Sequence, residues 1–167
     1  MTIAIAQRRL PVAYRHAEVR AADWLARHSI SILRMSLGVI FLGFGVLKFV
    51  PGLSPAEPLA ARTLDILTLG LLPTQVGLIG VATLESTIGV LLLSGRWLRL
   101  ALALLAVELI GILSPLVLLP GEMFRGLLAP TLEGQYVLKD LLVAAAGLVV
   151  AARTLGARLV VDARGSR

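Results

Sequence analysis

Four long apolar runs alternate with short joints that carry most of the polar residues of the chain. The runs lie at about residues 30–50, 75–93, 97–119 and 135–152. An α-helix rises about 1.5 Å per residue, so each run is close to the length that crosses roughly 30 Å of hydrocarbon. The pattern therefore predicts an all-α, polytopic membrane protein built as a bundle of four transmembrane helices.

The joint between the first two runs, residues 54–73, is long enough to contain an element of its own. Its charged residues Glu57, Arg62 and Asp65 are interspersed with leucines at helical spacing, and the segment is too polar to span a membrane. We expect an amphipathic helix that lies at the membrane interface and packs on the outer mouth of the bundle.

The remaining joints predict how the helices connect. Gly95 and Arg96 form a joint so short that the second and third runs must fold as an antiparallel hairpin. Pro115, inside the third run, lacks an amide proton and is expected to kink that helix. Glycines in the first two runs are expected to let helices pack closely, namely Gly38, Gly43, Gly45, Gly77, Gly80 and Gly89.

The composition agrees with a lipid environment, since 57% of the residues are hydrophobic and only 16% are charged. The net charge is +6, and arginines flank the apolar runs at residues 8–27 and 153–167. Basic flanks of this kind predict cytoplasmic termini, and their placement argues against nucleic-acid binding. We divide the chain into a basic N-terminal segment (1–28), a transmembrane domain (29–153) and a basic cytoplasmic tail (154–167).

The chemistry available to the chain is limited by its composition. It contains no cysteine, and therefore no disulfide, thiol nucleophile or iron–sulfur ligand of its own. Its two histidines, His16 and His28, lie outside the centres of the apolar runs, which argues against a haem or a metal site. We expect no intrinsic cofactor and no metal.

Ionisable residues within the apolar runs are the candidates for a functional site, because a charge at the centre of a bilayer costs about 2.5–3.5 kcal/mol. Glu85 and Glu108 lie near the middle of the second and third runs, at depths that differ by about 4–5 Å. Two neighbouring carboxylates cannot both stay ionised at low dielectric constant unless each has a cationic partner. The candidate partners are Lys48, in the first run, and Lys139, beside Asp140 in the fourth.

Two interpretations of these charges remain open. In the functional one, Glu85 and Lys48 form the centre of a polar site in the outer half of the bundle. In the structural one, the charges form buried ion pairs that fix the register of the helices. For Lys48 and Lys139 a third option is that the ammonium groups extend outward to the interface. Arg34 is expected to anchor the first run at the inner leaflet.

Three segments carry a resemblance to a known family. Residues 34–49 read RMSLGVIFLGFGVLKF, residues 85–99 read ESTIGVLLLSGRWLR, and residues 130–142 read PTLEGQYVLKDLL. They resemble the DoxX-like family of small four-helix bacterial membrane proteins. The third segment is similar to the Gly-Gln-aromatic-x-x-Lys-Asp/Asn element of its reactive-chlorine-resistance branch.

Carried over residue by residue, the resemblance marks Lys48, Glu85, Glu133, Gln135, Lys139 and Asp140, whereas Glu108 has no counterpart in these motifs. Together with the bilayer argument, it gives the candidate residues of a quinone-binding site or polar core: Lys48, Glu85, Glu108, Gln135, Lys139 and Asp140. The resemblance also implies a location in the bacterial cytoplasmic membrane and a link to oxidative stress or to quinone-dependent oxidoreductases.

The leading hypothesis is a membrane subunit or accessory that assists a redox protein partner and offers a quinone a site near Lys48, Glu85 and Lys139. The chain is not expected to catalyse redox chemistry unaided, because a bound quinone or a partner's cofactor would have to carry the electrons. The alternatives are a structural or assembly subunit of a larger membrane complex, with no chemistry of its own, and a small transporter.

Overall fold

The computed structural model describes residues 12–126 and 129–157, with side chains from residue 16 onward. Over these ranges the fold is all helical, with one isolated bridge between Phe124 and Pro130. The helices are α1 (Val12–Leu47), α2 (Glu57–Leu67), α3 (Thr74–Ser94), α4 (Leu98–Leu113), α5 (Pro115–Leu118), α6 (Pro120–Met123) and α7 (Leu132–Thr154). The outer parts of both predicted basic termini, residues 1–11 and 158–167, lie outside the described residues.

Four segments are long and apolar enough to cross a bilayer: His16–Leu47, Thr74–Ser94, Leu98–Leu118 and Leu132–Thr154. Their outward faces carry many large apolar side chains, as helices in contact with lipid do. These observations confirm the predicted all-α membrane fold with four transmembrane helices. The additional helix between the first two spans is α2, which at 11 residues is too short to cross.

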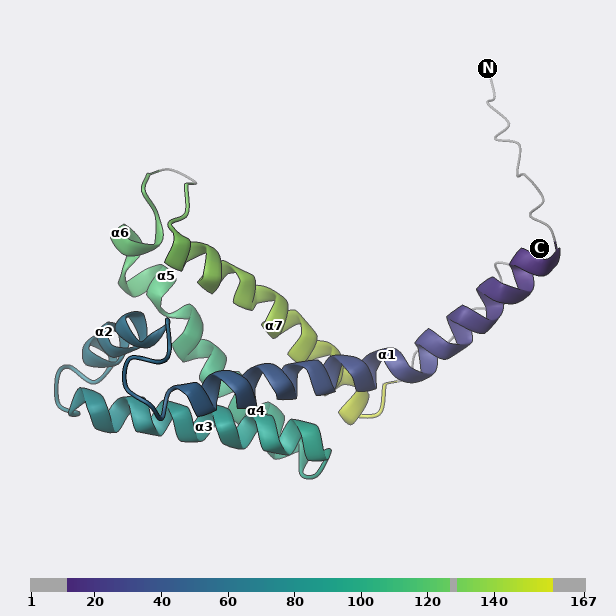
Figure 1. Cartoon of the computed structure of the whole chain (residues 1–167), viewed down its shortest axis with the longest axis horizontal. Coiled ribbons are helices and arrows are strands. Elements are labelled where there is room, and N and C mark those ends of the chain that lie inside the picture. Colours follow the sequence, from purple (N-terminus) through teal and green to yellow (C-terminus); the bar gives the residue numbers. More distant parts are fainter. Residues whose placement is uncertain (1–11, 127–128, 158–167) are drawn as a thin grey trace, which may run out of the picture.

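α1 and α3 pack closely side by side, and glycines form their contact (Figure 1). A Cβ atom on Gly89 would lie 2.4 Å from the amide nitrogen of Leu42, and one on Gly45 would lie 2.7 Å from that of Ser86. Gly38 is equally constrained by its neighbours on α3. Side chains do not approach backbone atoms this closely, so the two helices can lie together only because these positions are glycine.

The other glycines that were predicted to serve packing divide into two groups. Gly77 of α3 does so, since a Cβ atom there would lie 3.1 Å from Leu64 of α2. Gly43 and Gly80 meet no atom within 4 Å and face open space. The apolar pattern therefore identifies glycines within spans but does not show which face of the helix meets a neighbour.

α1 ends beside the middle of α3 (Figure 1). Gly45, in the last turn of α1, lies against Ser86, which is near the centre of α3. The N-terminal half of α3 is covered by α2 instead, through the contact of Leu64 with Gly77. α4 turns back along α3, and α7 packs against both α4 and α1 (Figure 1). The end of α1 is therefore placed inside the bundle and not at its rim.

The predicted hairpin between α3 and α4 is present, and Arg34 of α1 helps to close it. Gly95 ends α3 in a left-handed conformation with φ of 69°. The guanidinium of Arg34 donates hydrogen bonds to the carbonyl oxygens of Leu92 and Leu93. Arg34 thus binds carbonyl groups that the end of a helix leaves without partners, and its expected role as an inner-leaflet anchor stays a prediction.

The structure shows no break between the N-terminal segment and the first span. The sequence was divided at residue 28 into a basic N-terminal segment and the transmembrane domain, but α1 is continuous from Val12 to Leu47. No proline or glycine occurs between residues 12 and 37, so nothing in the sequence interrupts the helix there. The N-terminal half of α1 extends away from the bundle (Figure 1).

The third and fourth spans begin and end nearly as predicted. At Pro115 the third span is irregular and not broken: α4 ends at Leu113 and α5 begins at Pro115, but Ser114 between them keeps helical dihedral angles (φ −58°, ψ −32°). The predicted loop that follows contains the short helix α6. α7 begins three residues earlier than expected, where the hydroxyl of Thr131 caps it by accepting a hydrogen bond from the amide of Gly134.

Candidate functional site

Lys48 and Glu85 form an ion pair inside the bundle. The Nζ atom of Lys48 lies 2.6 Å from Oε1 and 2.5 Å from Oε2 of Glu85, and donates to both. Their side chains are only 8% and 6% exposed, so the lysine does not extend outward to the interface. Lys48 directly follows α1, and the position of the end of α1 beside the middle of α3 brings its ammonium group to Glu85.

Glu108 of α4 and Asp140 of α7 extend this pair into a group of four ionisable residues. Glu108 is 7% exposed and Asp140 is partly buried. Both lie within electrostatic range of Glu85 and Lys48. Glu85 and Glu108 both face the interior of the bundle, as the prediction requires. We call Lys48, Glu85, Glu108 and Asp140 the charge cluster; each of the four spans contributes one member, from within the span or directly after it.

The charge cluster lies deep along the spans. At about 1.5 Å per residue, Glu85, Glu108 and Asp140 are roughly 12–17 Å from the ends of their spans at Thr74, Leu118 and Leu132, respectively. The hydrocarbon core is about 30 Å thick, so these depths correspond to its middle. Charged groups at this depth are expensive, and their inward orientation is the arrangement that such groups normally require.

The remaining candidates on α7 do not join the cluster. Gln135 and Lys139 are exposed, and so is Glu133. The ammonium of Lys139 lies 5.1 Å from the centre of the Tyr136 ring, on the outer surface of the helix. Successive residues of a helix point about 100° apart, so Asp140 can face the bundle while Lys139 faces away from it.

A groove of about 290 Å³ lies at the surface where Phe49 meets the partly exposed side of α3, and we call it the Ser86 groove. Two of its lining residues, Phe49 and Ser86, directly follow Lys48 and Glu85 in the chain. The hydroxyl of Ser86 is buried and makes no hydrogen bond with any residue that the structure describes. The groove is lined by Phe49, Thr83, Ser86, Thr87, Val90 and Leu91.

Ser86 is a residue that the sequence analysis missed. Serine and threonine are common in membrane helices, where their hydroxyls usually donate to a carbonyl one turn earlier. Thr83 and Thr87 do this, toward Ile79 and Thr83 respectively. Nothing in the sequence distinguishes Ser86 from them, because its lack of a partner depends on the close contact with Gly45 of α1.

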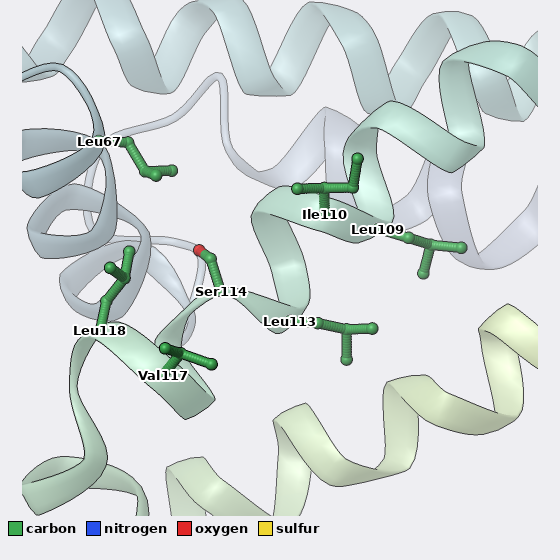
Figure 2. Close-up of a pocket in the computed structure, with 7 residues that line it drawn as sticks. All are labelled: Leu67, Leu109, Ile110, Leu113, Ser114, Val117 and Leu118. Atoms are coloured by element: carbon green, nitrogen blue, oxygen red, sulfur yellow. The ribbon is translucent and has the colours of Figure 1, made fainter.

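A second groove, of about 440 Å³, lies at the junction of α4 and α5, next to the end of α2 (Figure 2). Among the described residues, those that line it are uncharged, and Ser114 is its one polar side chain. That hydroxyl already donates to the carbonyl of Gly111. The groove is lined by Leu67, Leu109, Ile110, Leu113, Ser114, Val117 and Leu118. Its surface suits acyl chains and contains no member of the charge cluster.

Residues 29–118 match the model of the DoxX family. The match covers more than half of the chain. The chain belongs to the DoxX family. The matched region contains Lys48, Glu85 and Glu108 of the charge cluster, together with the Ser86 groove, and ends before α7. Searches of curated proteins and of solved structures each found no match.

Proposed function

We propose that this DoxX-family protein is a membrane subunit or accessory of a redox system, linked to quinone or to oxidative stress. The observation that carries the proposal is the Lys48–Glu85 ion pair, which lies deep in the bundle and whose next residues in the chain, Phe49 and Ser86, line a groove. A buried ion pair often contributes less to stability than apolar side chains of the same size. Ionisable residues at this depth are therefore functional candidates by default.

The close contact of α1 with α3 supports a functional role for the ion pair. Gly45 and Gly89 already set the register of these two helices through backbone contacts. The charges of Lys48 and Glu85 are not needed for that purpose, although their burial still has to be compensated. The interpretation that the pair exists only to fix the register is accordingly the weaker of the two.

The Ser86 groove is the proposed quinone site. The ring of Phe49 offers a face for stacking against a quinone. The hydroxyl of Ser86, which has no partner but is buried against Gly45, would have to turn toward the groove to donate to a quinone carbonyl. The isoprenoid tail would continue from the groove into the surrounding lipid. A bound quinone supplies two-electron, two-proton redox chemistry. Lys139 has no part in this site, because its side chain lies on the outer surface of α7.

The electrons require a protein partner. The chain has no cysteine, and its own side chains offer no redox centre. A soluble or membrane-bound oxidoreductase must therefore deliver electrons to the quinone, and this protein would position the quinone and the partner together. The Gly-Gln-aromatic-x-x-Lys-Asp motif at residues 134–140 supports a function in resistance to reactive chlorine or related oxidants.

The orientation follows from the flanking charges. An even number of spans leaves both ends of the transmembrane domain on one side, and the arginines near both ends favour the cytoplasmic side of the bacterial inner membrane. α2, α5 and α6 then lie on the outer side, and the projecting half of α1 lies on the cytoplasmic side, where a soluble partner can reach it (Figure 1).

A quinone assay tests the proposed site. The protein is purified from membranes in a mild detergent, and the quinone in a solvent extract is quantified per chain. Thr87→Leu, at an exposed position that lines the groove, should fill it and reduce the quinone content at least tenfold. Val107→Leu, on an exposed face of α4, is the matched control and should retain it. Equal quinone in the two variants, or none in the wild type, contradicts the proposal.

A paired substitution separates the functional role from the structural one. Lys48→Met combined with Glu85→Gln removes both charges and keeps the approximate shape of each side chain. Our proposal predicts normal abundance of this double variant but loss of oxidant resistance or partner activity. Full activity of the double variant would assign the pair to structure alone.

A further inference from the structure

The charge cluster contains more acidic groups than its one cation can balance. Lys48 supplies one positive charge, which Glu85 neutralises through two short hydrogen bonds. Glu108 and Asp140 lie near this pair without a cation of their own. Full ionisation would leave two uncompensated negative charges inside the membrane domain. Such groups become neutral when no counter-charge is present.

Glu108 is the more deeply buried of the two acids in the charge cluster that have no ion-pair partner among the described residues. It is 7% exposed, and within residues 12–126 and 129–157 its carboxyl group makes no hydrogen bond or ion pair. Other cations of the bundle are engaged elsewhere: Arg34 at the end of α3, Arg62 with Glu122, and Lys139 over the Tyr136 ring. Among the described residues no second cation pairs with Glu108, so the ligand that neutralises it is sought outside them.

The geometry favours a proton over a metal ion as that ligand. In the described part of the chain, no three histidine, cysteine or acidic side chains are close enough together to hold one metal ion. Glu85, Glu108 and Asp140 come near one another electrostatically but do not form a common coordination shell. A proton requires a single oxygen atom and no such shell.

We propose that Glu108 and Asp140 form a proton-binding site in the interior of the bundle, in which each carboxyl group binds one proton while Glu85 stays ionised against Lys48. Each proton is taken from water and forms an O–H bond on a carboxylate oxygen, so the cluster becomes electrically neutral. Neighbouring acids at this depth are the elements from which proton relays are built. The proposal does not rest on the redox role, because it follows from the charge balance alone.

Infrared spectroscopy of the protein in lipid vesicles tests the proposal. Protonated carboxylic acids give a carbonyl stretch that is separate from the bands of carboxylates and shifts in heavy water. The wild type should show this band at neutral pH. Glu108→Gln and Asp140→Asn should each remove about half of it, since each eliminates one of two protonated groups. Glu133→Gln, at an exposed position on α7, is the control and should leave the band unchanged.

The outcomes divide clearly. Absence of the band in the wild type at neutral pH overturns the proposal, and this measurement needs no variant. A band that persists unchanged in both Glu108→Gln and Asp140→Asn also overturns it. Loss of the wild-type band on adding sodium or potassium would show that a metal cation takes the place of the protons. Glu108→Gln substitutes one neutral group for another, so its thermal unfolding should match that of the wild type.

Discussion

The single ammonium group of Lys48 binds both carboxylate oxygens of Glu85, 37 residues further along the chain. The pair joins the end of α1 to the middle of α3, where the helices already touch through glycine. The pair lies in the middle of the membrane domain because α1 ends beside the centre of α3.

Breaking the ion pair from one side should destabilise the protein strongly. Glu85→Gln removes the carboxylate that accepts both hydrogen bonds of the buried Lys48 ammonium, which should cost about 3–5 kcal/mol at a pH low enough to keep Glu108 and Asp140 protonated. Adding Lys48→Met to this variant should recover most of the loss, because no buried charge then remains. Unfolding in mixed micelles with increasing SDS measures the three free energies. A double variant as unstable as Glu85→Gln alone would show that the two side chains are not coupled.

Substitution of the contact glycine of α3 should separate two helices. A Cβ atom in Gly89→Ala would lie 2.4 Å from the backbone nitrogen of Leu42, so α1 must move away. We expect a loss of about 1–3 kcal/mol in the free energy of unfolding. Gly80→Ala on the same helix faces open space and should be neutral or stabilise by up to about 1 kcal/mol. Similar losses in both variants would contradict the assigned contact.

Removal of the Arg34 side chain should loosen the hairpin between α3 and α4. Arg34→Ala leaves the carbonyl groups of Leu92 and Leu93 without the guanidinium, at a cost of about 1–3 kcal/mol. Hydrogen exchange of the amides near Gly95 should become faster in this variant. Arg99→Ala, at an exposed position, is the control and should change stability by less than about 0.5 kcal/mol. Unchanged exchange in Arg34→Ala would indicate that the residue serves only as a lipid anchor.

The surface ion pair between α2 and α6 should contribute little to stability compared with the buried Lys48–Glu85 pair. Arg62 and Glu122 are 2.9 Å apart, but their side chains are 55% and 33% exposed. Such pairs contribute less than about 1 kcal/mol and weaken as salt is added. Arg62→Ala should therefore have a small effect on thermal unfolding, and the effect should disappear at high salt. A large effect that persists at high salt would mean that Arg62 has a further role.

The apolar pattern predicted the four spans and the helix between the first two, and Pro115 indicated the irregularity in the third span, because these features depend on local sequence. It did not predict where α1 ends relative to α3, since that register comes from contacts between Gly45, Gly89 and their distant neighbours. The partner of Arg34 is 58 residues away along the chain, which explains why its role was also missed.

The candidate site was also predicted only in part, because some of its features depend on contacts between residues that are distant in the chain. The free-energy cost of a charge at the centre of a bilayer identifies Glu85 and Glu108 as candidates from the sequence alone. It does not distinguish Asp140, which faces the bundle, from Lys139, one residue earlier and exposed. That distinction depends on the rotation of α7, which tertiary packing sets. The Ser86 hydroxyl lacks a partner only because of the contact with α1, so no local signal reveals it.

The most direct test of the proposed function is purification of the wild-type protein from native membranes in a mild detergent, followed by mass spectrometry of co-purifying proteins and lipids. We predict an oxidoreductase in fixed proportion to this chain, together with bound quinone. Recovery of the chain with phospholipid alone would contradict the redox role and favour a transporter, for which the proton-binding site would then be the natural starting point.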